Sequence, residues 1–223
     1  KENEEIGREF FRPMTVSFGI SALNEATVMY KGKSLYEDKA QFAEEVLRFI
    51  NDYANKYKKE DGILYAIYGT PGESMCALQV EQFRKKYGIV KGVSDRKYMS
   101  NSFHVHVSED ITPIEKMETE YKCFHLCNGG NIIYNRFGTD YNTEAYITLI
   151  REAMKRGDYY GCNISKNYCC TCGAEFLDEE KCPSCGSNDL VRISRICGYV
   201  GFERIHGDTR MNEGKRAEIA ERK

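Results

Sequence analysis

The sequence predicts an α/β protein with a parallel, helix-covered sheet, followed by a small metal-binding module. Up to about residue 165, short apolar segments rich in β-branched residues alternate with longer segments of helical periodicity. Continuous apolar strands of this kind are typical of parallel sheets whose two faces are both covered by helices. Near Lys166 the composition changes and a cysteine-rich stretch begins. Charged residues make up 30% of the 223 residues and hydrophobic residues 41%, as in ordinary globular proteins.

The expected strands are short and apolar, and turn residues or helix starts bound them. They are residues 14–20, 63–68, 102–107, 130–134 and 159–164. The expected helices carry apolar residues at helical spacing and begin or end at recognisable signals, such as Thr112-Pro113, Asn142 and Asp61-Gly62. They are residues 35–58, 71–87, 114–124 and 142–156.

The segment Gly69-Thr-Pro-Gly-Glu-Ser74 follows an expected buried strand and opens a helix. Thr70 suits the N-cap, Pro71 the first helical position, and Glu73 the third position of a capping box. The free N–H groups and positive dipole end of such a helix also suit an anion. A well-capped helix and an anion-binding loop explain these residues equally well.

Charge and composition exclude several classes of function. The net charge is −2 and no basic patch is present, so generic nucleic-acid binding is not favoured. No apolar run reaches membrane-spanning length, and no signal peptide is visible. Ten cysteines in a chain of this length indicate free thiols in a reducing, cytoplasmic setting rather than a secreted disulfide scaffold. The chain begins with Lys1 rather than Met, so we expect a fragment of a longer or split protein.

Two Cys-x-x-Cys pairs, Cys169/Cys172 and Cys182/Cys185, are separated by nine residues. Each pair is typical of a zinc knuckle, and four thiolates complete a closed tetrahedral site without an open position for water. We therefore predict one structural zinc ion. Two disulfides or a redox-active pair are the alternatives, but a glycine directly after each second cysteine favours knuckles. Cys170, inside the first pair, is expected to be a spare thiol.

The cysteine pattern is followed by Arg195-Ile-Cys-Gly-Tyr199 and then by Asn212-x-Gly-Lys215. This combination resembles the C-terminus of the anaerobic (class III) ribonucleoside-triphosphate reductases, in which Arg-x-Cys-Gly-Tyr is the glycyl-radical motif. The resemblance extends upstream through residues 17–26, 68–74 and 101–104, so it covers essentially the whole chain.

The resemblance implies a division into three parts. Residues 1–165 would be the second half of a catalytic β/α barrel, residues 166–190 a zinc ribbon, and residues 191–223 the glycyl-radical loop and tail. Gly198 would carry the radical, because a glycine without its α-hydrogen can become planar and share the spin with both flanking peptide groups. Without the cysteine cluster and the Arg-Ile-Cys context, turn glycines would be the preferred interpretation of Gly198 and Gly201.

The resemblance also implies a mechanism and its partners. An activase with an iron–sulfur cluster and S-adenosylmethionine would take a hydrogen from Gly198, and the radical would oxidise a cysteine N-terminal to this chain. That thiyl radical would reduce a ribonucleoside triphosphate to its 2′-deoxy form, with formate as the expected reductant. The complete enzyme would be a homodimer, and an allosteric ATP-cone domain would also lie outside the chain. The candidate substrate-binding residues are Thr70, Gly72, Glu73, Ser74, Met75 and Asn24.

Two other functions compete with the reductase. One is a zinc-ribbon interaction protein without catalysis, and the other is a different glycyl-radical enzyme such as a formate-lyase relative. The interaction protein predicts that Gly198 is exposed on a surface turn, whereas the reductase predicts that it lies on a buried loop tip. Among other candidates, His104 and His106 would share one face of a strand and are expected to line a core or a site.

Overall fold

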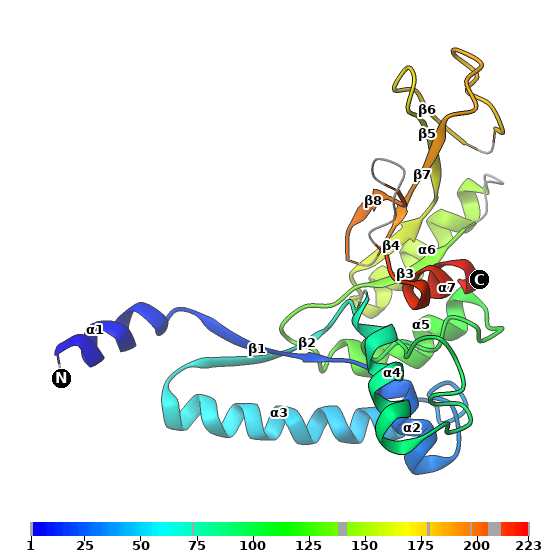
Figure 1. Ribbon diagram of the computed structural model, residues 1–223. Coiled ribbons are helices and arrows are strands. Elements are labelled where there is room, and N and C mark those ends of the chain that lie inside the picture. Colours follow the sequence, from blue (N-terminus) through cyan, green and yellow to red (C-terminus); the bar gives the residue numbers. More distant parts are fainter. Residues whose placement is uncertain are drawn as a thin grey trace.

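A computed structural model describes residues 2–72, 74–137, 142–177, 179–196, 198–204 and 211–222 (Figure 1). In chain order its elements are α1 (Glu2–Phe11), β1 (Thr15–Ile20), α2 (Leu23–Lys31), α3 (Gln41–Asp61), β2 (Leu64–Gly69), α4 (Met75–Tyr87), α5 (Pro113–Phe124), β3 (Ile133–Arg136), α6 (Thr143–Arg156), β4 (Tyr160–Asn163), β5 (Lys166–Cys169), β6 (Glu175–Phe176), β7 (Leu190–Arg195), β8 (Val200–Phe202) and α7 (Glu213–Glu221). The α/β class is confirmed. The described strands form two two-stranded sheets and one four-stranded sheet, so these residues form no closed barrel.

β1 and β2 form a parallel pair with α3 packed beside β2. Figure 1 shows this pair above α3, with α1 extending away from the rest of the molecule. The expectation that β1 is buried is wrong for the described residues, since Val16 and Phe18 are 42% and 47% exposed. The physical reason is that β1 pairs with β2 alone among the described strands. An apolar composition does not bury a strand that nothing covers.

The main core joins α2, α3, β2, α5 and the segment before α5. Leu47, Ile67, Phe103 and Cys123 are all 0% exposed within it. A second cluster, between α5, α6 and β3, contains Met117, Ile133, Leu149 and Ala153. The expected apolar face of the helix at 35–58 is confirmed only in part: Leu47 is buried in the core, whereas Phe49, Tyr53 and Tyr57 are 63%, 50% and 45% exposed.

Helix α4 begins at Met75, four residues after the expected first helical residue. The predicted cap at Thr70 is therefore wrong, and Glu73 lies outside the described residues. The N–H group of Gly72 donates instead to Asn101 Oδ1 at 2.8 Å, and this bond to a distant segment keeps residues 70–72 out of the helix. Ser74 takes the N-cap position without a side-chain capping bond.

The expected strand at 102–107 is also wrong, because these described residues form turns and irregular backbone. Ser102 has a φ of 52°, which turns the chain out of an extended conformation. The N–H of Val105 donates to Glu120 Oε1 at 3.0 Å, so a side chain of α5 replaces a neighbouring strand as partner.

The helix starts at Thr112 and Asn142 are confirmed. Thr112 forms a capping box with Glu115, and the side chain of Asn142 accepts a hydrogen bond from the N–H of Ala145. α5 and α6 flank the parallel pair β3–β4, which is shorter than the two strands expected there. No helix in the described part of the chain has the length and apolarity needed to cross a membrane.

The four-stranded sheet has the order β6-β5-β7-β8 and is antiparallel throughout. β5 begins at Lys166, where the composition changes. β7 begins at Leu190 and crosses the expected boundary at residue 191, so the cysteine-rich part and the segment leading to Gly198 share one sheet. In Figure 1 this sheet projects from the rest of the molecule, with α7 beside its base.

Candidate functional site

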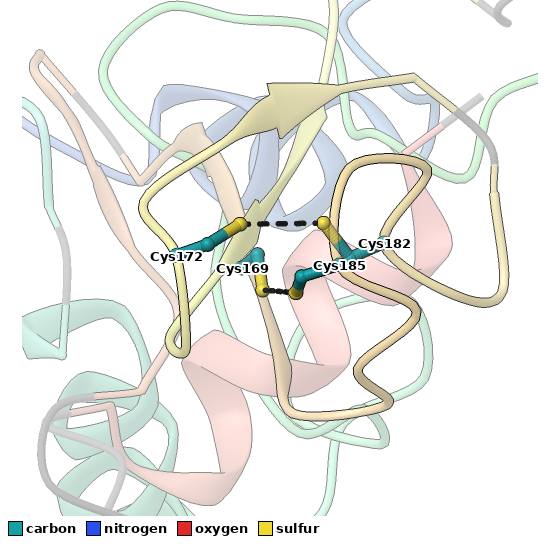
Figure 2. A group of neighbouring side chains, drawn as sticks. All are labelled: Cys169, Cys172, Cys182 and Cys185. Atoms are coloured by element: carbon teal, nitrogen blue, oxygen red, sulfur yellow. Dashed lines mark hydrogen bonds between the residues drawn. The ribbon is translucent and has the colours of Figure 1, made fainter.

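The four cysteines of the two pairs converge at the end of the four-stranded sheet that is remote from α7 (Figure 2). The Sγ atoms of Cys169, Cys172, Cys182 and Cys185 all lie within 4.8 Å of one another. Those of Cys169 and Cys185 are 3.6 Å apart, and those of Cys172 and Cys182 are 3.5 Å apart. Zn–S bonds of ~2.3 Å in a tetrahedron require sulfur–sulfur separations of about 3.8 Å. The donor set and its spacing therefore fit a zinc ion.

Each pair is shaped by a glycine in the left-handed region. Gly173 and Gly186 have φ values of 77° and 75°, which a side chain would strain. Their N–H groups donate to the carbonyls of Cys169 and Cys182 at 2.9 and 2.8 Å, closing the two turns. This explains why a glycine follows the second cysteine of each pair.

The backbone around the cysteines favours thiolates. Burial raises the pKa of Cys169, but N–H groups of Cys172 and Thr171 donate to its sulfur and the net effect lowers this pKa to about 6. In Cys185 the N–H of Ser187 lowers the pKa, yet burial and the neighbouring thiols raise it to about 12. Four adjacent thiolates repel one another, so full ionisation of the group requires a cation.

Cys170 lies apart from this group. It is exposed and is not one of the four converging cysteines. Its expected role as a spare thiol therefore agrees with its position.

The four-cysteine end of the sheet is joined directly to the segment that leads to Gly198 through strand pairing. In the β5–β7 register, Cys169 lies opposite Leu190 and Lys166 opposite Ile193. β7 then turns into β8, and these two strands with residues 196–199 are called the Gly198 hairpin below. The N–H of Ile196 donates to the carbonyl of Tyr199 at 3.0 Å and closes the tip.

Gly198 lies at this tip, and Cys197 beside it is outside the described residues. The expectation of a buried loop tip is wrong for the chain as described, because Gly198 is exposed. In the direction of a side chain it faces Pro71, because a Cβ built on Gly198 would be 3.5 Å from Cγ of Pro71. Gly201 differs, because it pairs within β8 opposite Ser194 and is not at the turn.

The loop 70–75 therefore meets the Gly198 hairpin, which the sequence did not predict. Gly72 is packed tightly, since a Cβ there would lie 2.3 Å from Cys76 Sγ and 2.9 Å from Asn101 Oδ1. The hydroxyl of Thr70 points inward, within 1.9 Å of where a Cβ of Gly19 would be. Ser74 is half-buried, and Pro71 and Met75 are exposed, so this loop is accessible at Pro71 and at its end at α4.

Asn24 lies in the interior, away from solvent. It is 1% exposed, and its Oδ1 accepts a hydrogen bond from the N–H of Leu35 at 2.9 Å. Its Nδ2 donates to Glu25, whose carboxylate also accepts from Ser100. These contacts tie together α2 and two loops, which is a structural role.

A buried cluster that the sequence analysis missed centres on Glu120. Its Oε2 lies 2.9 Å from both His104 Nδ1 and Lys116 Nζ. Burial raises the pKa of Glu120, but Lys116 and His104 outweigh it and hold this pKa at about 2. The i, i+4 spacing of Lys116 and Glu120 was the available signal, although such pairs usually lie on helix surfaces.

A cavity of about 230 Å³ lies between this cluster and α7. Tyr98, His106, Tyr134, Asn135, Glu218 and Arg222 are among its lining residues. Burial, the largest effect, lowers the pKa of His106 to about 3, so its ring is neutral near pH 7. His104 and His106 thus line a site, as expected, and neither belongs to a metal-binding group among the described residues.

Comparison with known proteins decides which family these features come from. A family model described as anaerobic ribonucleoside-triphosphate reductase matches residues 1–223. The chain belongs to this family. It is 30% identical to the anaerobic ribonucleoside-triphosphate reductase of Haemophilus influenzae, over 93% of this chain and 31% of that protein. The corresponding protein of Enterobacteria phage T4 is 31% identical, over 93% of this chain and 34% of its own length.

Solved structures agree with this assignment at the level of the fold. An anaerobic ribonucleotide reductase superposes with a TM-score of 0.74 at 19% identity, covering 90% of this chain and 33% of that chain. The enzyme from Thermotoga maritima with dATP bound in the specificity site gives 0.72 at 19% identity, covering 90% and 36%. The chain thus spans about a third of the length of the reductases it matches.

Proposed function

We propose that this chain is the part of an anaerobic ribonucleoside-triphosphate reductase that stores the radical, on Gly198. The observation that carries the proposal is the position of Gly198, at a hairpin tip whose strand β7 pairs with β5 and leads back to the four-cysteine group. Exposure of Gly198 does not favour the interaction protein, because the chain spans only about a third of its relatives. Membership of the reductase family favours catalysis over both competing functions.

In this proposal the four thiolates hold one structural Zn²⁺. Bound zinc would supply a fixed tetrahedral link between the two knuckles and no reaction chemistry, because four protein ligands leave no open position. The β5–β7 pairing then transmits this rigidity to the Gly198 hairpin. The zinc-binding residues thereby serve the reaction by placing Gly198.

The reaction begins when a radical-SAM activase, with S-adenosylmethionine as the source of the oxidising radical, removes one hydrogen atom from Cα of Gly198. A cysteine in the length of reductase that this chain does not span then gives its S–H hydrogen atom to Cα. The resulting thiyl radical takes the 3′-hydrogen atom of the ribose. The 2′-hydroxyl leaves with a proton as water. Formate becomes carbon dioxide and supplies two electrons and one proton, which form the new C2′–H bond. The 3′-hydrogen then returns from the cysteine.

The substrate phosphates would lie at the N-terminal end of α4, where the positive helix dipole meets accessible backbone. Ser74 and Met75 are the candidates best placed for this role, because the N–H of Gly72 is already bonded to Asn101. The further partners proposed are the rest of the reductase, a second copy in a homodimer, and the activase. A reducing, cytoplasmic setting completes the proposal, because thiolate ligands and thiyl chemistry both need reduced cysteines.

Electron paramagnetic resonance of the assembled reductase, activated without oxygen, tests the radical assignment. We expect a doublet, because one α-hydrogen remains on Gly198, and α-deuterated glycine should collapse it. Admitting oxygen should cut the backbone at Gly198 and release a C-terminal piece beginning near Tyr199, measured by mass spectrometry.

Gly198→Ala should abolish both the doublet and the cut while the zinc content stays unchanged. Gly201→Ala is the matched control, because Gly201 lies in the same hairpin but pairs within β8. It should keep the cut at residue 198. Absence of a doublet from the activated enzyme, or a cut at Gly201, would refute the assignment.

A further inference from the structure

The tip of the Gly198 hairpin is held by Arg222 at the C-terminal end of α7. Arg222 donates from Nη1 to the carbonyl of Arg195 and from Nη2 to the carbonyl of Ile196, the latter at 2.8 Å. These two carbonyls belong to the last residues described before Gly198. Arg222 is only 8% exposed, so these charge-assisted bonds are shielded from water.

A buried carboxylate orients Arg222. Glu218 accepts from Nε of Arg222 at 2.9 Å and from Nη2 at 2.8 Å, and Lys215 Nζ lies 2.7 Å from the same carboxylate. Burial raises the pKa of Glu218, but the charges and hydrogen bonds of Lys215 and Arg222 outweigh this effect. The net pKa is below the ordinary value, so the carboxylate stays ionised. A planar guanidinium that donates both to a carboxylate and to two backbone carbonyls has little freedom to move.

The start of α7 holds the other side of the contact at Gly198. Nδ2 of Asn212 donates to the carbonyl of Ser74 at 2.9 Å. α7 also packs closely on α4, because a Cβ on Gly214 would lie 2.3 Å from Cβ of Ala77. One helix therefore contacts both the Gly198 hairpin and the loop 70–75. The hairpin and the loop meet where Gly198 faces Pro71.

We propose that α7 is a positioning bridge for the radical site, with Arg222 and Asn212 as its positioning residues. The bridge sets how the hairpin tip approaches the loop 70–75, and hence where Cα of Gly198 lies relative to the hydrogen it must exchange. This inference rests on the proposed function. Because hydrogen-atom transfer depends steeply on placement, a shift of about 1 Å can cost on the order of 10²-fold in rate.

The test uses the assembled, activated reductase with Arg222→Lys. Lysine keeps the positive charge beside Glu218, but its single ammonium cannot reach two carbonyls and both carboxylate oxygens in one plane. We expect the zinc content to stay unchanged and the turnover per radical, from spin counting and product formation, to fall on the order of 10²-fold. Turnover per radical separates positioning from folding, because a merely unstable enzyme loses spins and zinc together.

Arg204→Lys is the matched control, because Nη2 of Arg204 donates to the carbonyl of Leu190 at the zinc-binding end of the same strand. It should leave turnover per radical within about twofold, as expected for an exposed residue far from the tip. Asn212→Asp tests the other end of the bridge, since it keeps the helix-capping oxygen and loses the donor to Ser74. It should also lower turnover per radical, and it decides the matter if Arg222→Lys does not fold.

The failures are distinguishable. No doublet in the unmodified enzyme would refute the proposed function itself. A normal doublet with unchanged turnover per radical in a folded Arg222→Lys or Asn212→Asp enzyme would overturn the positioning bridge alone.

Discussion

β1 and β7 are both six-residue strands, yet the more apolar of the two, β1, is the more exposed. β1 is the more apolar and is exposed along almost its whole length. β7 contains two arginines and a serine, but two of its residues, Val191 and Ser194, are buried and only Arg192 is exposed. β7 has a neighbouring strand on each side, β5 and β8, and Arg222 at the end of α7 donates to the carbonyl of its last residue, Arg195. β1 has β2 alone among the described strands.

The difference teaches that the two regions are stabilised by different means. The four-stranded sheet is assembled from contacts close in sequence and from the four-cysteine group, so it can be complete within this chain. β1 has a sequence suited to two covered faces but is mostly exposed among the described residues, whereas β2 packs beside α3 and places Ile67 in the main core. We expect the remaining length of the reductase to supply that cover.

The largest expected effect comes from removing one zinc ligand. Cys182→Ser should release the metal and abolish the order of residues 166–202, because structural zinc sites contribute about 10–16 kcal/mol to folding. The β1–β2 pair should be unaffected. Zinc analysis and hydrogen exchange on the two regions measure both outcomes.

Cys170→Ser is the control for this variant, because Cys170 is exposed and outside the group of four. It should retain one zinc per chain. If Cys170→Ser lost zinc and Cys169→Ser kept it, the ligand assignment would be wrong by one residue.

A smaller effect should separate Phe103 from Phe18. Phe103 is 0% exposed, so Phe103→Ala should lower the free energy of unfolding by ~3–5 kcal/mol. Phe18 is 47% exposed in this chain, and Phe18→Ala should change that free energy by about 0.5 kcal/mol or less.

In the full-length reductase the same Phe18→Ala should cost ~3 kcal/mol or more, if the expected cover is present. Denaturant titrations of the two proteins give both values. Equal costs in the short and full-length proteins would contradict the idea that β1 is covered by the rest of the enzyme.

The smallest of the three effects is the contribution of Glu120 to the pH dependence of stability. In contrast to the exposed β1, Glu120 is 0% exposed. Its folded pKa of about 2 lies below the ordinary 4.5, so its contribution is fully present above about pH 4.5 and is lost as the pH falls toward 2. The difference corresponds to about 3 kcal/mol. Glu120→Gln should remove this part of the acid sensitivity, measured as unfolding free energy against pH.

Glu152→Gln is the control, because Glu152 pairs with Lys155 and Arg156 on the surface of α6. Surface pairs contribute little to stability, so its acid profile should follow that of the unmodified chain. Identical profiles for Glu120→Gln and the unmodified chain would show that the buried cluster does not act as described.

What could be predicted from the sequence was local. The cysteine spacing predicted the group of four because each knuckle closes within five residues. Thr112 and Asn142 were predicted because a cap needs a partner only three residues away. Thr70 has the same sequence signal, but the cap predicted there is wrong, because the N–H of Gly72 bonds to Asn101, 29 residues further along the chain.

What could not be predicted depends on partners far along the chain. Glu120 replaces a neighbouring strand for the segment at 102–107, which sequence periodicity cannot show. The meeting of Gly198 with Pro71 joins segments more than a hundred residues apart. The spacing of Lys215, Glu218 and Arg222 is visible in the sequence, but it is the spacing of an ordinary surface ion-pair row, and only the fold reveals that it is buried.

The pairing of Cys169 with Leu190 has a consequence for chain length. Because each strand residue advances the chain by about 3.3 Å, a slip of one residue between β5 and β7 would carry Gly198 that far and turn every β7 side chain to the opposite face. The pairing of Cys169 with Leu190 therefore fixes how far along the chain, and on which face of the sheet, the residues before Gly198 lie. A residue added within 190–196 would therefore change the position of Gly198 relative to Cys169.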